Sequence, residues 1–359
     1  MPTKLEDIAR ESGFSIATVS RVLNNTDYPV KASVREKILE TAQTMGYRPN
    51  LVARSLRTDQ TNTVGILVDD LLSPFTPPVV RGIQDQLKEN NFVSLIVNSD
   101  WDTEQEQAGI LSLLSRPVDG IIFVEYSHLT SSEALTNANK PGVFVHRLFG
   151  TSIKNSVVPD DIYGASLAVD HLIQLGHRSI AYIGGPGSWH NSKERLEGYK
   201  QTLEKHGISI MEEWIRPGDW EVEGGYQGAQ NLLHLSSRPT AIFAANDLMA
   251  LGAIYAIQDS GLSVPQDIAV VGYDNREFTG IVRPNITTVV MPVYEMGRIA
   301  AEILLKQIAD GTRENDEVKV KGELIIRDTC GASESQKTER RFERNTSLRR
   351  VMLHKDPDN

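Results

Sequence analysis

Short hydrogen-bonding side chains, two small or apolar residues and one arginine share a single stretch near the start of the chain: Ser15, Thr18, Ser20 and Asn24; Ile16 and Ala17; and Arg21. Hydroxyl and amide side chains of this length position phosphates, and an arginine reaches a phosphate or a guanine edge. The small residues would let the backbone approach a major groove closely. The stretch therefore predicts a DNA-binding surface, although an ordinary pair of surface helices would use the same residues.

A second group of candidate side chains is spread over the rest of the chain and comprises carboxylates, basic groups, an amide and aromatic rings: Asp70, Ser73, Phe75, His146, Arg147, Asp160, Trp189, Arg195, Trp220, Asn246 and Asp274. Polar groups of these types bind paired hydroxyls, and flat rings stack on C–H faces, which is the usual way to hold a sugar. Plainer roles fit some of them equally well. Trp220 is as readily a core residue, His146 fits a hydrogen-bonded strand end, and Asp247 is expected to cap the following helix.

Two short helices and a tight turn must position the first group. Thr3, with Glu6 three residues later, predicts a capping box at the start of the first helix, and Gly13 predicts its end. Ser15 is expected to cap the second helix, and a third helix with an apolar side ends at Gly46. Two helices joined by a short turn that contains glycine predict a helix-turn-helix. A head this small has a thin core and is expected to be only marginally stable alone.

Residues 48–60 form a short apolar segment bordered by arginines. Pro49 forbids a continuous helix from the head, and Asn50 can cap a new one. A helix of about seven residues does not persist alone in water, because nucleation is costly. We therefore expect a segment that folds on contact with DNA, where Leu56 would act as a minor-groove wedge. A flexible interdomain linker would have the same composition.

From Thr63 onward, predicted strands alternate with predicted helices. Strands are expected at 64–68, 92–98, 120–124, 142–146, 156–160, 180–184, 241–247, 268–274 and 323–327. Thr103 with Glu106 predicts a capping box at the start of one intervening helix. The alternation predicts parallel sheets covered on both faces, in two open α/β lobes of similar plan. Ligands of such sheets bind outside the carboxyl ends of the strands, where the second group of candidates falls.

The composition is that of a globular protein, with 359 residues, 40% apolar and 23% charged. The net charge of −10 is unevenly spread: residues 1–60 hold nine basic and seven acidic side chains, 9 − 7 = +2, which leaves −12 for the remainder. The acidic body should keep DNA at the basic end. No apolar run reaches a membrane span, no secretory segment is evident, and Cys330 is the single cysteine. We therefore expect a cytoplasmic protein without disulfides.

The first sixty residues also carry two specific motifs, LEDIARESGFSIATVSRVLN and, after it, GYRPNLVARSL. In this order and followed by an α/β body, they resemble the lactose/galactose repressor (LacI/GalR) family of bacterial transcription regulators. The resemblance runs from about residue 3 to about residue 331. It implies an all-α helix-turn-helix head joined to a two-lobed, periplasmic-binding-protein-like (type I) effector domain. The chain would cross between the lobes near residues 159, 290 and 320.

The resemblance also implies roles for single residues. Base reading would fall to Ile16, Ala17 and Arg21; phosphate contacts to Thr3, Ser15, Thr18, Ser20 and Asn24; hinge positions to Tyr47 and Asn50; and minor-groove contacts to Ala53 and Leu56. Arg195, Trp220, Asn246 and Asp274 match the family's effector positions. His146 stands where sugar-responsive members often have Asp, and Met291 where a polar side chain occurs, so the identity of the ligand stays open.

We expect the following organisation: a DNA-binding head over 1–47, a hinge over 48–60, an effector-binding and dimerisation domain over 61–333, and a disordered tail over 334–359. Lobe one would comprise about 61–158 and 291–319, and lobe two about 159–290 and 320–331. The function expected is that of a homodimeric regulator, a repressor of a carbohydrate-utilisation operon, that binds a palindromic operator under control of a small-molecule effector.

The rival interpretations are a stand-alone solute-binding protein and an α/β enzyme. A secreted binding protein needs a signal segment, and an enzyme needs a catalytic set that the candidate residues do not supply. The glycines at 184, 185 and 187 lack the spacing of a nucleotide-binding loop, so we predict no cofactor and no metal. The sequence leaves open the effector, the operator, a partner protein, and whether the effector releases or promotes DNA binding.

Overall fold

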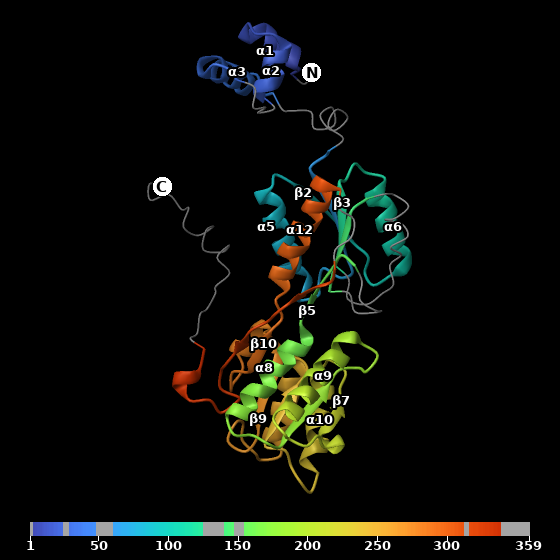
Figure 1. Cartoon of the computed structure of the whole chain (residues 1–359), viewed down its shortest axis with the longest axis vertical. Helices are drawn as coiled ribbons and strands as arrows, with labels where there is room; N and C mark the ends of the chain where they lie inside the picture. The colour runs from blue at the N-terminus through green and yellow to red at the C-terminus, as the bar shows by residue number, and fades with distance from the viewer. Residues whose placement is uncertain are drawn as a thin grey trace. The chain divides into compact units, whose positions relative to one another are not determined.

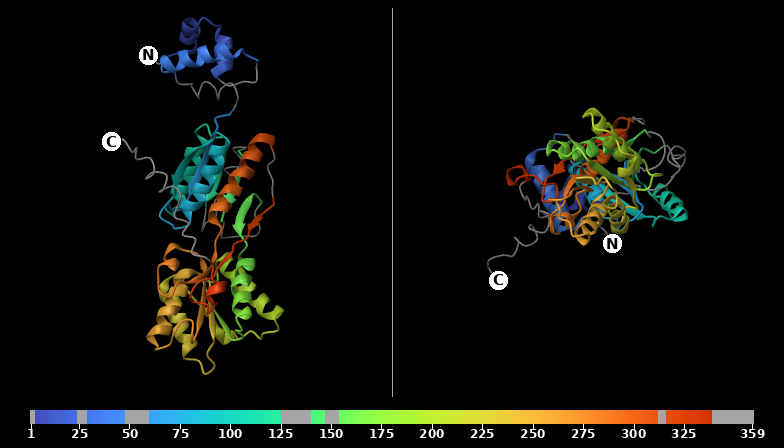
Figure 2. Two further views of the ribbon diagram at one scale, coloured as in Figure 1. Left: turned by 90° about the vertical axis from the view of Figure 1, so that its left-hand side faces the viewer. Right: turned by 90° about the horizontal axis from the view of Figure 1, so that it is seen from below.

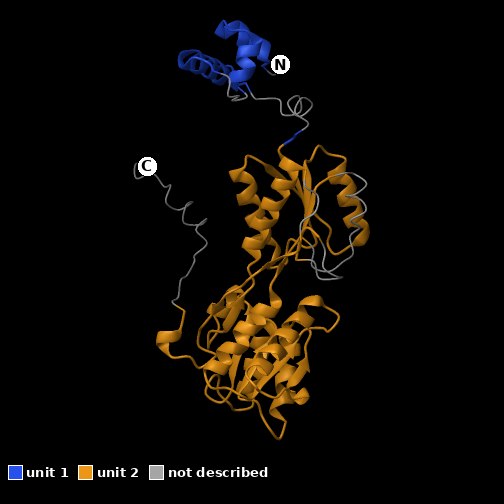
Figure 3. Cartoon of the chain, in the orientation of Figure 1, with its two compact units in different colours: residues 1–61 blue, residues 62–359 orange. Residues whose placement is uncertain are grey.

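The structure is a computed structural model that describes residues 3–23, 29–47, 60–124, 140–146, 154–311 and 316–338. Its contacts divide the chain into two compact units, residues 1–61 and residues 62–359 (Figure 3). Five of the predicted site residues lie outside the described residues: Asn24, Asn50, Ala53, Leu56 and Arg147. The predicted hinge and tail lie largely outside them as well.

The described residues of the first unit form three helices: α1 (Leu5–Ser12), α2 (Ile16–Leu23) and α3 (Ala32–Thr44). Their apolar faces meet in one small core of Ile8, Ala9, Val19, Val22, Ile38 and Ala42. Gly13 ends α1 with φ 78°, a left-handed conformation that costs glycine nothing, and this allows the chain to turn directly into α2. The predicted helix-turn-helix is present.

The predicted capping box of α1 is wrong by one residue. Lys4 occupies the N-cap position, and its backbone N–H donates to the Asp7 carboxylate at 2.9 Å. The Thr3 hydroxyl donates instead to the carbonyl of Met45 at 2.9 Å. Thr3 therefore joins the beginning of α1 to the end of α3, and Glu6 has no part in the cap.

The second unit contains two six-stranded sheets. The first has the strand order β11-β5-β4-β3-β1-β2, and all of its pairs are parallel. Its strands are β1 (Thr63–Val68), β2 (Val93–Asn98), β3 (Gly120–Val124), β4 (Gly142–Val145), β5 (Ser156–Pro159) and β11 (Val318–Val320). In the described part of this lobe the helices are α5 (Thr76–Glu89), α6 (Thr103–Leu114) and α12 (Val293–Asp310).

Helices cover both faces of this sheet, and alternate side chains of its central strands pack against one helix layer or the other. Ile66, Val68 and Ile122 belong to the core that α5 and α12 cover, whereas Leu67 and Phe123 belong to the core under α6. Successive side chains point to opposite faces, so each strand is apolar throughout. The helices α5 and α12 lie side by side, as two perpendicular views show (Figure 1, Figure 2).

The second sheet has the order β12-β10-β9-β8-β6-β7, in which β12 alone pairs antiparallel, with β10. Its strands are β6 (Ile180–Gly184), β7 (Ile215–Pro217), β8 (Ala241–Ala244), β9 (Ala269–Asp274), β10 (Thr287–Val290) and β12 (Leu324–Ile325). Its helices are α8 (Asp161–Gln174), α9 (His190–Lys205), α10 (Val222–Leu233) and α11 (Asp247–Asp259), of which α8 packs on α9 and α10 on α11. The chain passes between the sheets after β5, β10 and β11.

Sequence analysis predicted most of these elements but missed four of them, namely β7, α10, β10 and β11. The missed strands have only three or four residues. The helix α10 contains three glycines, which mask its periodicity, and it needs them: a Cβ on Gly225 would lie 2.1 Å from the carbonyl oxygen of Met249. The last predicted strand is shorter than expected, because β12 covers only Leu324–Ile325.

Two further predicted caps are wrong. The first turn of α6 is capped by Asp102, whose carboxylate accepts from the backbone of Glu104 and Gln105, and Glu106 is buried. Asn246, not Asp247, caps α11, because its side-chain oxygen accepts from Met249 N–H at 2.8 Å. In each case the residue one position earlier has the extended backbone that an N-cap requires.

Candidate functional site

The outer face of α2 carries residues predicted to contact DNA. Its side chains are fully or partly exposed: Ser15, Ile16, Ala17, Thr18, Ser20 and Arg21. The Ser15 hydroxyl accepts from Thr18 N–H at 3.1 Å, so it caps α2 as predicted. Val19 and Val22 face the core and fix which side of the helix points outward. The helix thus presents one arginine among small, polar and apolar groups, and Ile16 remains 49% exposed.

Tyr47 is the last residue that the structure describes before the predicted hinge. It is half-buried, packs on the head core, and its N–H donates to the carbonyl of Ala42 at 2.9 Å. Like Thr3, it therefore has a structural contact within the head.

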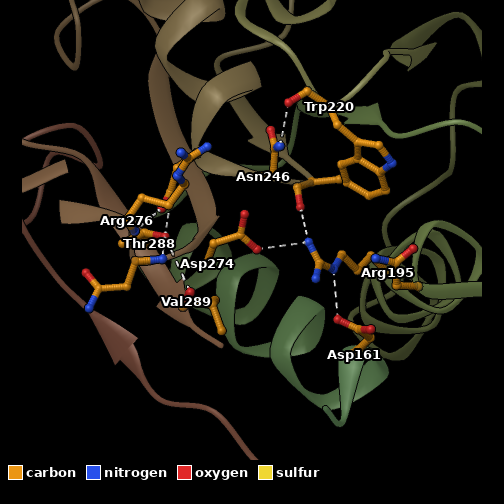
Figure 4. Close-up of polar contacts among 12 residues, drawn as sticks. Asp161, Arg195, Trp220, Asn246, Asp274, Arg276, Thr288 and Val289 are labelled. Atoms are coloured by element: carbon orange, nitrogen blue, oxygen red, sulfur yellow. Dashed lines mark hydrogen bonds and ion pairs between the residues drawn. The ribbon is translucent and has the colours of Figure 1, made fainter. Parts of the chain in front are cut away.

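In the second unit, Arg195 is the centre of a buried polar cluster, and only 1% of its surface is exposed. Its Nε donates to Asp161 Oδ1 at 2.8 Å, and its Nη1 lies 3.4 Å from Asp274 Oδ1 and also donates to the carbonyl of Ala245 (Figure 4). The guanidinium carbon lies 3.7 Å from the ring centroid of Tyr273. Helices α8 and α9 and the ends of strands β8 and β9 thus converge on one arginine.

Burial changes the pKa values of the carboxyl groups in this cluster. It raises the pKa of Asp274 to about 7, although Arg195 acts in the opposite direction. Burial also raises the pKa of Asp161, against the pull of the same guanidinium. One guanidinium therefore faces two carboxyl groups, and Asp274 changes charge near neutral pH. A carboxyl group of this kind both accepts and donates hydrogen bonds.

Asn246 and Trp220 form the next layer of the cluster. The Asn246 amide nitrogen donates to the carbonyl of Trp220 at 2.8 Å, while its oxygen caps α11. The Trp220 ring centroid lies 5.6 Å from the Arg195 guanidinium carbon and 6.1 Å from the Trp189 ring centroid. Among the described residues, the buried indole N–H of Trp220 has no hydrogen-bond partner, which is costly unless a ligand supplies one.

The first lobe reaches this cluster through His146 and Phe75. His146 follows β4 and is buried, and burial, together with the charge of Arg195, lowers its pKa to about 3. It is therefore neutral at physiological pH. Phe75 packs on the cores of both lobes, and Trp189, which precedes α9, packs on the core of the first lobe.

The remaining predicted residues make local contacts. Asp70 accepts from the backbone N–H of Leu72 at 2.7 Å, and the Ser73 hydroxyl accepts from that of Phe75 at 3.4 Å. Asp160 caps α8 by accepting from Tyr163 N–H at 3.1 Å. The structure therefore places Arg195, Trp220, Asn246 and Asp274 close together. Asp70 and Ser73 lie in turns, and Asp160 is a helix cap.

Sequence analysis missed Asp161, which makes the shortest carboxylate contact with Arg195. Two adjacent aspartates open α8, and no local pattern distinguishes the one that caps the helix from the one that points inward. Asp247 has a different role from the predicted one. It is completely buried and accepts from Arg276 N–H at 2.7 Å and from the Thr288 hydroxyl at 2.6 Å.

Left-handed backbone at residues other than glycine gathers at the carboxyl ends of strands. His146 has φ 56°, Trp220 has φ 71°, and Asp274 and Asn275 have φ 109° and 57°. Such conformations are unfavourable for side-chain-bearing residues and concentrate at functional sites. The described part of the chain gathers no group of three acidic, histidine or cysteine side chains suited to a metal ion. None of the described helices has the length and apolarity needed to span a bilayer.

Comparison with known proteins relates both units to one kind of regulator. Family models match residues 4–50 (bacterial regulatory proteins, lacI family) and residues 169–330 (periplasmic binding protein-like domain). The catabolite control protein A of Priestia megaterium is 36% identical over 330 residues, or 91% of this chain and 99% of that protein. A lac repressor dimer bound to operator and the anti-inducer ONPF has 31% identity and a TM-score of 0.75, covering 92% of this chain and all of that one. A complex of the regulator CelR with cellobiose has 30% identity and a TM-score of 0.66, covering 91% and 99%.

Proposed function

Because the chain belongs to the LacI family of bacterial regulatory proteins, we propose that it is a dimeric repressor of a carbohydrate-utilisation operon, controlled by a sugar bound at the Arg195 cluster. The chain is a DNA-binding transcriptional regulator and, like its relatives, not an enzyme.

One observation supports a sugar more than any other: a buried arginine is flanked by two carboxyl groups beneath an indole ring whose N–H has no hydrogen-bond partner among the described residues. Carboxylates accept from hydroxyls, the indole N–H donates to a hydroxyl or ring oxygen, and the ring stacks on C–H groups. The related CelR was solved with cellobiose, which agrees with this chemistry.

For operator binding, we propose that two copies place their α2 helices in the major grooves of a palindrome. Ile16, Ala17 and Arg21 would read bases. Thr3, Ser15, Thr18, Ser20 and Asn24 would hold phosphates. Residues 48–60 would form the hinge, with Tyr47 directly before it, Asn50 near its start, and Ala53 and Leu56 in the minor groove. A regulator of chromosomal genes acts where the DNA is, so we propose the cytoplasm as its location.

The effector proposal is tested by Trp220→Phe, which keeps an aromatic ring and removes the N–H. A net hydrogen bond contributes about 0.5–1.5 kcal/mol, so we expect sugar affinity to fall about two- to tenfold. A thermal-shift screen of mono- and oligosaccharides on the full chain selects the sugar, and titration calorimetry measures the affinity.

Trp214→Phe is the matched control. Trp214 is buried, but its N–H already donates to the carbonyl of Ser237 at 3.2 Å, away from the cluster. We expect this variant to bind the sugar as the wild type does. Unchanged affinity in Trp220→Phe would remove the indole N–H from the site, and a screen in which no sugar shifts the melting temperature would refute the effector class.

A further inference from the structure

A tryptophan on the turn after β2 is not accounted for by the cluster described above. Trp101 keeps 44% of its surface exposed, although indole is one of the largest apolar side chains. It follows the carboxyl end of β2, the edge strand of the first sheet (Figure 1). Its backbone has φ 61°, and that of Asp100 before it has φ 51°. Two consecutive left-handed residues cost about 1–2 kcal/mol each, so the surrounding structure must impose them.

The surrounding hydrogen bonds do impose this turn. Trp101 N–H donates to the carbonyl of Asp69 at 3.3 Å, and the Asn98 side-chain oxygen accepts from Leu71 N–H at 3.1 Å. On the far side, the carboxylate of Asp102 caps α6 with bonds of 2.8 and 2.9 Å. Trp101 is therefore held in a fixed turn that is joined to the β1–α5 connection, which carries Asp70.

The sheet order fixes how far this turn lies from the Arg195 cluster. The consecutive strands β4, β3, β1 and β2 end in the same direction, with His146 after β4, Asp70 after β1 and Trp101 after β2. The charge of Arg195 contributes, after burial, to the lowered pKa of His146, so His146 marks the side of the sheet edge nearest the Arg195 cluster. Neighbouring strands are about 4.8 Å apart, so the end of β2 lies about 14 Å from the end of β4. The hydrogen bond from Trp101 N–H to the carbonyl of Asp69 places the Trp101 backbone beside the end of β1, which is about 10 Å from the end of β4. One sugar ring does not span that distance, whereas a short chain of rings does.

We propose that Trp101 is the outer stacking platform of an elongated carbohydrate site, and hence that the effector is an oligosaccharide of two or more rings. The inner ring binds at Arg195, Asp274 and Trp220, and an outer ring lies on the Trp101 indole. Asp100 directly precedes Trp101, and Asp70 lies in the connection to which the turn is hydrogen-bonded; their carboxylates would accept from hydroxyls of the outer ring. This inference rests on the sugar effector proposed above and specifies its size.

The test compares Trp101→Ala and Trp101→Phe in the full-length protein with Tyr255→Ala as control, since Tyr255 is an aromatic of similar exposure, 45%, on α11. Titration calorimetry measures affinity for sugars of one to four rings built from glucose, galactose or xylose. We expect affinity in the wild type to rise at least tenfold from one ring to the longer members. Trp101→Ala should lose that gain while binding single rings as before, Trp101→Phe should keep part of it, and Tyr255→Ala should resemble the wild type.

The outcomes separate the two proposals. If single rings bind and longer chains gain nothing, or if Trp101→Ala weakens single rings and longer chains equally, the outer platform is refuted while the sugar effector stands. If no sugar binds, both proposals fail together. If Trp101→Ala alters the sedimentation behaviour of the protein but not its sugar affinity, the side chain belongs to a protein interface and the outer platform is refuted.

Discussion

Arg195 is a charge almost completely removed from water, and its neighbours make that arrangement tolerable. Removing one partner of a buried ion pair costs about 3–5 kcal/mol, because the remaining charge loses its compensation. The two carboxyl groups are not equivalent. Asp161 lies 2.8 Å from the guanidinium and Asp274 lies 3.4 Å from it. The looser contact leaves Asp274 the better placed of the two to bind a hydroxyl group.

The raised pKa of Asp274 predicts a dependence of stability on pH. In the unfolded chain an aspartate has a pKa of about 3.9, whereas burial raises it to about 7 in the folded protein. Between these values the folded state holds a proton that the unfolded state releases, so the free energy of unfolding falls as pH rises. Asp274→Asn removes this contribution. We expect the free energy of unfolding of the variant, minus that of the wild type, to rise by about 1–3 kcal/mol from pH 5 to pH 8.

Urea unfolding of both proteins at several pH values, followed by near-ultraviolet circular dichroism, measures this difference. Asp161 and Asp247 also have pKa values raised by burial, but both remain in the variant. The difference between the two proteins therefore reports Asp274 together with its effect on Asp247, whose pKa the charge of Asp274 raises. Parallel stability curves across this pH range would contradict the prediction.

At the scale of elements, the packing of α5 on α12 depends on two glycines. A Cβ on Gly297 would lie 2.2 Å from the carbonyl oxygen of Val79, and one on Gly82 would lie 2.0 Å from that of Tyr294. Alanine favours a helix over glycine by about 1 kcal/mol, but overpacking against backbone costs about 1–3 kcal/mol or more. We expect Gly297→Ala to lower the melting temperature, because the clash outweighs the helix preference.

Differential scanning calorimetry of the full chain checks this expectation. Gly187→Ala is the control, because its added Cβ would meet nothing within 4 Å and its backbone is not left-handed. A melting temperature for Gly297→Ala equal to or above that of the wild type would show that the helices separate easily.

The elements also show how far sequence reasoning extends. Alternating apolar runs predicted the long strands and helices, because burial on both sheet faces leaves a continuous signal. They did not predict α10, in which Gly225 allows the close contact with Met249 of α11 and Gly228 the contact with Ile183 of β6, both far away in the sequence. At the site, residue types predicted Arg195 and Asp274, whereas the contact with Asp161 depends on how α8 faces α9. The direction in which Asp161 points at the start of α8 depends on tertiary packing, which neither composition nor spacing predicts.

At the scale of the whole molecule, effector and operator must be coupled. Operator affinity that changes by some factor on effector binding requires effector affinity to change by the same factor on operator binding, typically by about 1–3 kcal/mol. We propose that the hinge carries this coupling. Leu56→Ala should weaken operator binding, because the minor-groove wedge is lost, while the free protein binds effector as before.

Fluorescence anisotropy with a labelled palindromic duplex measures operator affinity, with and without the sugar, and calorimetry measures sugar affinity. Arg21→Ala provides the comparison, since it should weaken operator binding through the major groove and leave the effector coupling intact. If Leu56→Ala binds operator as tightly as the wild type, the wedge role is wrong.

The three passages of the chain between the sheets have a consequence for synthesis on the ribosome. The first sheet gains its last strand at Val318–Val320 and the second at Leu324–Ile325. Neither lobe is a contiguous piece of sequence, so the first waits for residues 318–320 and the second for residues 324–325 to emerge, long after the three-helix head has left the exit tunnel. Domains fold as they are made, from the amino end onward. During synthesis, the helix-turn-helix head can therefore fold well before the two-lobed ligand-binding domain is complete.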